Sequence, residues 1–454
     1  MTKRMHLIGF YMHSPINHTA LSWADPEDDR VEGMAQFDHW KRLARTLERG
    51  KFDAAFFADT PGGMERYKES FEDYVRYGVT WPCHDPMALL GVMLAETKHL
   101  GLAVTSSTAG THPYHTVRRL STLDYISGGR VGWNIVSGHL RGEHRALGLD
   151  QIEHDKRYDQ ADEYMEICYA LWNGVQPGAI RFDRQRGEFA DPSKVAVVDF
   201  AGAHYRCHTV PPTLLSAQGR PVLFQAGSSG RGQKFALKHS DVVFSIQARG
   251  VDGMKSFIEK LNASSVAEGR VEPPKVVFGI QCVLGGTETE AKRRQAEIFD
   301  RIPLDAALSR MSGTLGIDFS KIDLDTPLAA NTTDASRGML TALAKIMARF
   351  PPGAGGLARA NGGIVMRISN EGILVILFVG LIAGWLAGKI VRGTGFGLIG
   401  DILVGIAGAL VASFLFPKLG IHIGTGLVSE IIYSAIGAVL LLLIVRLVRT
   451  GGRF

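Results

Sequence analysis

The sequence predicts an α/β fold: a (β/α)₈ barrel of the TIM type that lacks its last unit, followed by an all-α segment of three transmembrane helices. Two observations lead to this prediction. Short apolar runs alternate with longer amphipathic runs over the first two thirds of the 454 residues, and three longer apolar runs close the chain. Apolar strands that alternate with helices are typical of a parallel sheet covered on both faces.

Seven apolar runs predict the strands of the barrel. In order they are residues 7–12, 54–59, 100–107, 130–137, 221–227, 241–246 and 276–285. Amphipathic runs between them, such as 157–174, predict the helices. Seven such units fit a closed barrel better than an open sheet. No convincing eighth strand follows the helix-like run 287–301.

One segment interrupts the rhythm of strands and helices. Residues 174–220 are polar and contain several Gly and Pro residues. We interpret this segment as an insertion over one end of the barrel, a place where loops often shape an active-site mouth. The predicted domains are a barrel over 1–345, a junction over 346–370 and a membrane domain over 371–454.

The three closing runs, residues 372–390, 399–416 and 427–445, are each near the length that spans a bilayer. Basic residues follow the first and third runs, and the positive-inside rule then places the barrel outside the cytoplasm. The N-terminal residues are too polar for a signal peptide, which predicts a cytoplasmic barrel instead. The two parts of the chain therefore predict opposite sides of the membrane.

Composition argues against several classes of function. The net charge of +5 is mild and the basic residues are scattered, so no nucleic-acid surface is expected. The four cysteines form no CxxC pair, which argues against a disulfide framework or a zinc site and predicts idle thiols. His112 and His115 lie three apart but lack further ligands nearby, so no metal is expected.

Polar residues at the ends of predicted strands are candidates for a functional site, because barrel enzymes place their sites there. Asp59, Thr105 and Asn134 end the second, third and fourth strands. His18 lies near the end of the first strand, where a plain surface histidine is an equally good interpretation.

The stretch "QAGSSGRG" predicts an anion site. Ser228 and Ser229 stand where a helix begins, and Gly residues let a phosphate approach the backbone amides. An ordinary serine N-cap explains the same pattern. His154 and Tyr158, four residues apart on one helical face, could add to a phosphate site or simply begin a solvated helix. Together these residues point to a phosphorylated cofactor.

Four motifs in order carry a resemblance to a known family. They are "FFADT", "LAVTSST" with "HPYHTVRRLSTLDYISGGRVGWNIVS", "HDKRYDQADEY" and "GRPVLFQAGSSGRG". Over residues 5–345 the chain resembles the bacterial-luciferase-like flavin monooxygenases, and within them the nitrilotriacetate monooxygenase component A type.

This resemblance implies an enzyme that takes reduced FMN from a separate NAD(P)H:flavin reductase and uses O₂ to oxygenate a small organic substrate. It implies FMN contacts at two places. Asp59, Thr105 and Asn134 would line the isoalloxazine, whereas His154, Tyr158 and Ser228 or Ser229 would hold the phosphate. His18 is a candidate pocket residue. The resemblance is compatible with a homo-oligomer and leaves the substrate open. A deazaflavin-dependent oxidoreductase of the same superfamily is an alternative.

The last part of the chain resembles the small transglycosylase-associated membrane proteins, which are linked to stress. Met366 begins a stretch of the size expected for a complete protein of that kind. This suggests the hypothesis that a monooxygenase reading frame lost its end and became joined to such a protein. The alternative function is then a small membrane protein that carries an inactive enzyme remnant.

Overall fold

The computed structural model describes residues 5–227, 229–246 and 250–322, together with 333, 335–337 and 340. The chain divides into two units, Met1–Met366 and Arg367–Phe454, and every described residue belongs to the first. Within that described part, no helix combines the length and the apolar character needed to cross a bilayer. The three predicted membrane spans lie outside the described residues.

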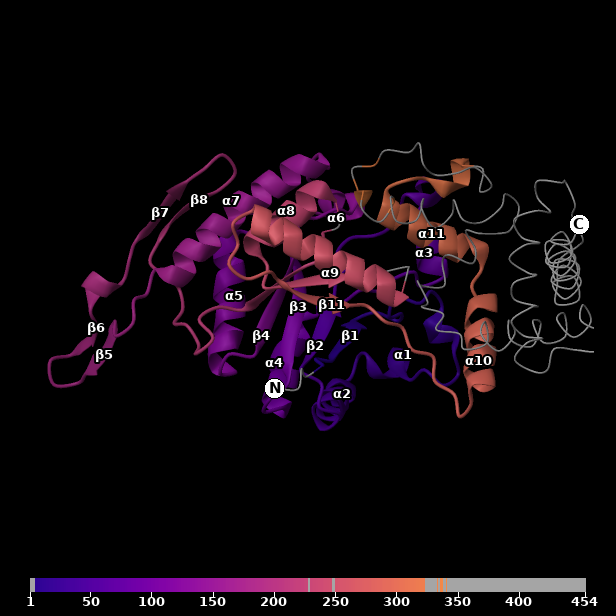
Figure 1. The fold of residues 1–454 in the computed structure, drawn as a ribbon, viewed down its shortest axis with the longest axis horizontal. Helices are drawn as coiled ribbons and strands as arrows, with labels where there is room; N and C mark the ends of the chain where they lie inside the picture. The colour runs from indigo at the N-terminus through magenta and orange to yellow at the C-terminus, as the bar shows by residue number, and fades with distance from the viewer. Residues whose placement is uncertain are drawn as a thin grey trace, which may run out of the picture. The chain divides into compact units, whose positions relative to one another are not determined.

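A seven-stranded parallel sheet forms the centre of the first unit (Figure 1). Its strands in spatial order are β1 (Ile8–Met12), β2 (Ala54–Ala58), β3 (Gly101–Ser107), β4 (Val131–Val136), β9 (Val222–Gln225), β10 (Val242–Ser245) and β11 (Lys275–Phe278). Each strand lies within a run predicted from the sequence or begins one residue before it. The predicted 276–285 strand is shorter than expected and ends at Phe278.

The sheet is curled rather than flat. Phe10 on β1 and Phe244 on β10 stack with ring centroids 5.4 Å apart. These strands are five positions apart in the sheet, a distance of roughly 24 Å if the sheet were flat. The curled parallel sheet confirms the predicted α/β class and is consistent with a TIM-type barrel. Within the described residues, no hydrogen-bonded pairing joins β11 to β1.

Helices alternate with these strands. The described ones are α1 (Arg30–Gly33), α2 (Phe37–Arg49), α3 (Glu72–Arg76), α4 (Met87–Glu96), α5 (Pro113–Ile126), α6 (Arg141–Ala146), α7 (His154–Asn173), α8 (Gly230–His239), α9 (Gly250–Ala267), α10 (Glu288–Asp300) and α11 (Leu304–Leu315). Capping residues determine where helices begin, as at the start of α5. His112 caps α5 by accepting the Tyr114 amide, and Pro113 occupies its first turn, where a missing N–H costs nothing.

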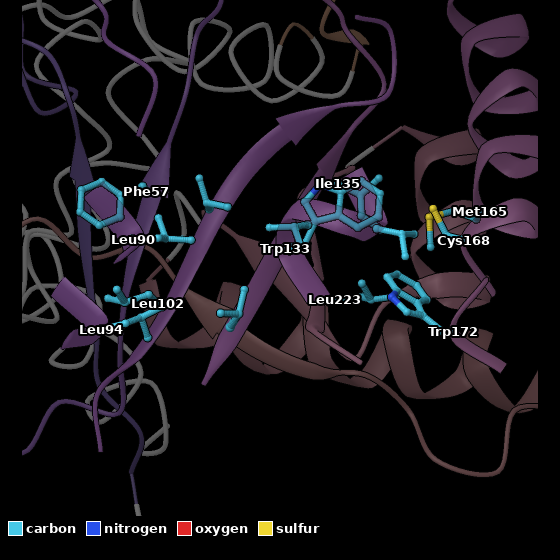
Figure 2. Close-up of a cluster of buried hydrophobic side chains, with 14 of the residues drawn as sticks. Phe57, Leu90, Leu94, Leu102, Trp133, Ile135, Met165, Cys168, Trp172 and Leu223 are labelled. Atoms are coloured by element: carbon cyan, nitrogen blue, oxygen red, sulfur yellow. The ribbon is translucent and has the colours of Figure 1, made fainter. Parts of the chain in front are cut away.

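Side chains alternate between two faces of the curled sheet, as the period of a strand requires. Residues such as Phe57, Leu102 and Trp133 face outward and pack on the surrounding helices, where Leu90 of α4 and Trp172 of α7 meet them (Figure 2). Phe56, Ala103 and Phe224 form a second cluster on the inner face, with Phe10 packed against it. Because Thr105 and Asn134 follow the same alternation, they also face inward.

The predicted insertion 174–220 contains two antiparallel hairpins that extend away from the sheet (Figure 1). The first pairs β5 (Ile180–Asp183) with β6 (Glu188–Ala190), and the second pairs β7 (Val198–Ala201) with β8 (Arg206–Thr209). Tyr205 in the second hairpin donates to the carbonyl of Thr108, just beyond β3. The insertion therefore contacts the end of the sheet where the candidate site lies.

Candidate functional site

Thr105 and Asn134 form the floor of the candidate site on the inner face of the sheet. They are paired across β3 and β4, and each is 5% exposed. Asn134 Nδ2 donates to Thr105 Oγ1 over 2.9 Å. Asn134 Oδ1 is buried, and no described residue donates a hydrogen bond to it. A buried acceptor without a donor is costly, so this atom is suited to an N–H group of a bound molecule.

Asp59 lies just beyond β2, where it accepts a hydrogen bond from Cys83 Sγ over 3.5 Å. Burial raises the pKa of Asp59 to about 6 and that of Cys83 to about 11. Cys83, predicted as an idle thiol, therefore lies in contact with a candidate site residue. A cavity of about 400 Å³ adjoins them, with apolar walls that include Phe71, Tyr74 and Trp81.

Glu143 is a buried carboxyl in the same region as the half-buried Asp59, and the sequence patterns did not reveal it. Burial raises its pKa to about 7; a hydrogen bond from Ser107 opposes this shift, and the charge of Asp59 adds to it. Close packing of α6 on the loop after β2 holds Glu143 in place. A Cβ on Gly142 would lie 1.8 Å from the carbonyl oxygen of Gly63, so only glycine fits there.

Glu143→Gln is expected to remove a pH dependence of stability. Because the folded state raises the pKa of Glu143, its contribution to stability is greatest below pH 4.5 and is lost as pH rises through about 7. The difference amounts to about 3 kcal/mol. Urea unfolding at pH 5 and pH 8, followed by tryptophan fluorescence, measures it.

In that experiment the Gln variant should gain stability relative to wild type at pH 8 but not at pH 5. Glu153→Gln, the same change at an exposed position, is the control. An equal pH dependence in wild type and Glu143→Gln would contradict the assignment.

The start of α8 forms the second part of the site. Ser229 Oγ accepts the amide of Gly232 over 3.0 Å and caps the helix, as its N-cap interpretation predicts. A Cβ on Gly232 would lie 2.7 Å from Tyr158 Oη, so glycine allows α8 to approach α7. Ser228, the neighbouring candidate, lies outside the described residues.

His154 and Tyr158 begin α7 and are buried, with 4% and 7% exposure, so they do not form a solvated helix start. Their rings meet edge to face at 5.3 Å, and His154 Nδ1 lies 2.6 Å from Asp155 Oδ1. The guanidinium of Arg231, on α8, lies 5.6 Å from the Tyr158 ring centroid. The structure thus brings Tyr158 and Ser229 together beside Gly232, with His154 against the Tyr158 ring.

His18 lies apart from these groups. Its ring packs on Phe10, with centroids 4.7 Å apart, and its Nδ1 lies 3.0 Å from Arg310 Nη2. Its exposure fits the surface interpretation, whereas these two contacts place it at the opening of the curled sheet. Arg310 belongs to α11 and was not singled out by any sequence pattern.

The described residues contain no group of three or more His, Cys, Asp and Glu side chains arranged to hold a metal ion. The "HPYH" histidine His112 has a structural role instead. Besides capping α5, its Nε2 lies 3.0 Å from the carbonyl oxygen of Arg206 in the inserted hairpin.

The comparison with known proteins decides the family. Residues 17–342, more than half of the chain, match the family described as luciferase-like monooxygenase. This chain belongs to the luciferase-like monooxygenase family. A curated relative, the long-chain alkane monooxygenase of Geobacillus thermodenitrificans, is 38% identical over 328 residues, which cover 71% of this chain and 73% of the relative.

Other relatives agree with this family assignment. The dimethyl-sulfide monooxygenase of Hyphomicrobium sulfonivorans is 36% identical over 349 residues, covering 76% of this chain and 72% of that protein. The crystal structure of a long-chain alkane monooxygenase matches with a TM-score of 0.71 and 33% identity over 80% of each chain. The luciferase-like chain is accordingly an enzyme, a flavin-dependent oxidoreductase.

The C-terminal part of this luciferase-like monooxygenase matches a second family. Residues 402–450 are similar to the family described as transglycosylase associated protein. This match suggests membrane association for the end of the chain, in a region outside the described residues.

Proposed function

We propose that this chain is an FMN-dependent monooxygenase of the nitrilotriacetate monooxygenase component A type, which oxygenates a small organic substrate. The observation that carries the proposal is the unpaired, buried Asn134 Oδ1 on the inner face of the sheet. The isoalloxazine ring of a flavin carries an N–H group of the kind that this acceptor lacks. The packed neighbours of Asn134 would have to move aside to admit the ring.

The residues at the two parts of the site fit the two ends of FMN. Asp59, Thr105 and Asn134 would line the isoalloxazine. Ser229 and Tyr158, beside the start of α8, would hold the phosphate with His154, because backbone amides and hydroxyls at a helix N-terminus favour an anion. Ser228 is assigned to the phosphate from the sequence alone.

Reduced FMN would supply the reaction with O₂ through which the substrate gains an oxygen atom. The chain's own residues then have three tasks: to orient the ring, to exclude water and to hold protons. Glu143 and Asp59, with pKa values of about 7 and about 6, can exchange a proton near neutral pH. The apolar cavity beside Asp59 is suited to the organic substrate.

Named relatives support this choice of cofactor and partner. The nitrilotriacetate monooxygenase component A of Aminobacter aminovorans is 29% identical over 339 residues, and its name describes one component of a larger system. A dimethylsulfone monooxygenase of Pseudomonas fluorescens, 28% identical over 227 residues, is named as FMNH₂-dependent. We propose that a separate NAD(P)H:flavin reductase supplies reduced FMN here as well.

The match to transglycosylase-associated proteins supports a proposal for location. In it, residues 1–345 form the enzyme, 346–370 the junction and 371–454 a three-span membrane domain. The membrane domain would keep the enzyme at the membrane.

Titration of the full detergent-solubilised chain with FMN tests the proposed function. Quenching of flavin fluorescence should give a low-micromolar midpoint. Ser229→Ala should weaken binding about tenfold to a hundredfold, because charged hydrogen bonds to the phosphate are lost. Thr287→Ala removes a comparable N-cap from α10 and is the control, with no expected change.

Two results would reject the proposal. Absence of FMN binding up to millimolar concentrations would favour a membrane protein with an inactive enzyme remnant. Equal FMN affinity in wild type and Ser229→Ala would remove α8 from the phosphate site. The absorption spectrum of cofactor retained by the purified chain separates FMN from a deazaflavin.

A further inference from the structure

Arg310 is a cation without a carboxylate partner at the opening of the curled sheet. Its Nη2 lies 3.0 Å from His18 Nδ1, and its Nη1 is buried and has no hydrogen-bond partner among the residues that the structure describes. Across the part of the chain that the structure describes, no Asp or Glu forms an ion pair with it. Buried guanidinium groups are normally paired, because an unpaired charge away from water is costly.

In their protonation states at neutral pH, Arg310 and His18 can offer only hydrogen-bond donors to a bound molecule. Burial lowers the pKa of Arg310 to about 10, which still leaves it charged at neutral pH. Packing of its ring on Phe10 and the neighbouring guanidinium lower the pKa of His18, so its ring is neutral at neutral pH. Since arginine can only donate, His18 Nδ1 accepts its hydrogen bond and Nε2 carries the ring hydrogen.

The surroundings of the pair place it at the substrate side of the proposed site. His18 packs on Phe10, and Phe10 in turn stacks on Phe56 and Phe244 inside the curled sheet. Thr19, next to His18, is hydrogen-bonded to Gln281 beyond β11. Strand β9 leads to Ser229, which we propose for the FMN phosphate. It is four positions from β1 in the sheet. The FMN phosphate is therefore assigned to a different part of the opening.

We propose that Arg310, together with His18, binds an anionic group of the organic substrate, a carboxylate or a sulfonate. This inference rests on the proposed function and narrows its substrate class. The planar guanidinium fork matches the two oxygens of such a group. An incoming anion meets the exposed His18 first and reaches the enclosed Nη1 when this ring turns aside.

Isothermal titration calorimetry on the full chain tests the proposal with short probes. Butanoate and butanesulfonate are the anions, and butanamide is the neutral analogue. Short probes are chosen because they partition weakly into detergent micelles. Wild type should bind each anion at least about tenfold more tightly than butanamide, the preference expected from charged hydrogen bonds.

Three variants test whether the preference for anions depends on the charge of Arg310. Arg310→Gln should abolish the preference for anions, whereas Arg310→Lys should keep part of it because the charge remains. Arg118→Gln removes an exposed arginine from the outer helix α5 and should change nothing. Circular dichroism checks that each variant is folded.

The outcomes separate this inference from the proposed cofactor. Equal binding of anions and butanamide by wild type, or an unchanged preference in Arg310→Gln, would overturn it. If Arg310→Gln instead weakens FMN binding and leaves the preference for anions unchanged, Arg310 serves the flavin and the inference is wrong. An Arg310-dependent preference in a chain that binds no FMN would support the anion site while rejecting the cofactor.

Discussion

Asn134→Leu is expected to weaken FMN binding by about a hundredfold while leaving the stability of the flavin-free chain within about 1 kcal/mol of wild type. The two effects have different causes. Leucine cannot accept a hydrogen bond from the flavin. The loss of this hydrogen bond in a buried site costs about 2–3 kcal/mol of binding free energy. In the flavin-free chain, no described residue donates to Asn134 Oδ1, so the change there costs only the hydrogen bond from Nδ2 to Thr105 Oγ1, about 1 kcal/mol, and the added apolar side chain offsets part of this cost.

Fluorescence titration with FMN and urea unfolding of the flavin-free chain measure the two effects. The substitution also removes the donor to Thr105 Oγ1, so the double variant Asn134→Leu with Thr105→Val is the control for that loss. A variant that binds FMN as wild type does would show that Asn134 does not face the cofactor. A large loss of stability without FMN would show that its amide is already satisfied.

Asp162→Ala is expected to be strongly destabilising, by about 3 kcal/mol, because it removes the acceptor of the buried His239 ring and leaves Arg231 with only the exposed Asp159 as its carboxylate. Asp162 Oδ1 lies 2.6 Å from His239 Nε2 and 3.0 Å from Lys238 Nζ, and Oδ2 lies 2.5 Å from Arg231 Nη2. These contacts join α7 to α8, so FMN binding at the start of α8 should weaken as well. Thermal unfolding and FMN titration measure the two losses.

Asp159→Ala is a matched control for this prediction. Asp159 also pairs with Arg231, at 2.9 Å, but its side chain is 65% exposed, and exposed pairs contribute less than about 1 kcal/mol. Similar losses in the two variants would contradict the assigned role of Asp162.

The pH dependence of stability gives a second check on Asp162. Burial alone would raise the pKa of this carboxyl, but hydrogen bonds from His239, Arg231 and Lys238 outweigh burial and hold the pKa well below its usual range. Its stabilisation is therefore present above about pH 4, the usual pKa of an aspartate, and is lost as pH falls below it. Asp162→Ala should lose this part of the acid sensitivity.

The order of strands and helices could be predicted because it depends on local periodicity. All seven predicted strands are present, and α8 begins after Ser229 as its cap predicts. The length of the last strand was wrong, because apolar residues continue beyond Phe278 where the chain has left the sheet. The length of a strand also depends on where the strand paired with it ends, and an apolar run in the sequence does not contain this information.

Some of the candidate site residues could be selected from the sequence, and others could not. Asp59, Thr105 and Asn134 could be selected because barrel sites lie at strand ends, a rule that needs only the sequence. Glu143 and Arg310 could not, since neither belongs to a strand end or a recognisable motif. Arg310 meets His18 across 292 positions of the chain, and no local pattern encodes such a contact.

The sequence by itself determined the family and the alternation of strands and helices, and it was enough to select the residues that we propose for the phosphate site. These features depend on residues that lie a few positions apart, so the order of residues in the sequence is enough to predict them. The tertiary structure alone decided which polar atoms remain unpaired, as at Asn134 and Arg310, and which carboxyls have raised pKa values, as at Glu143 and Asp59. Burial and hydrogen bonding set these properties, and both arise when distant segments remove each other's side chains from water.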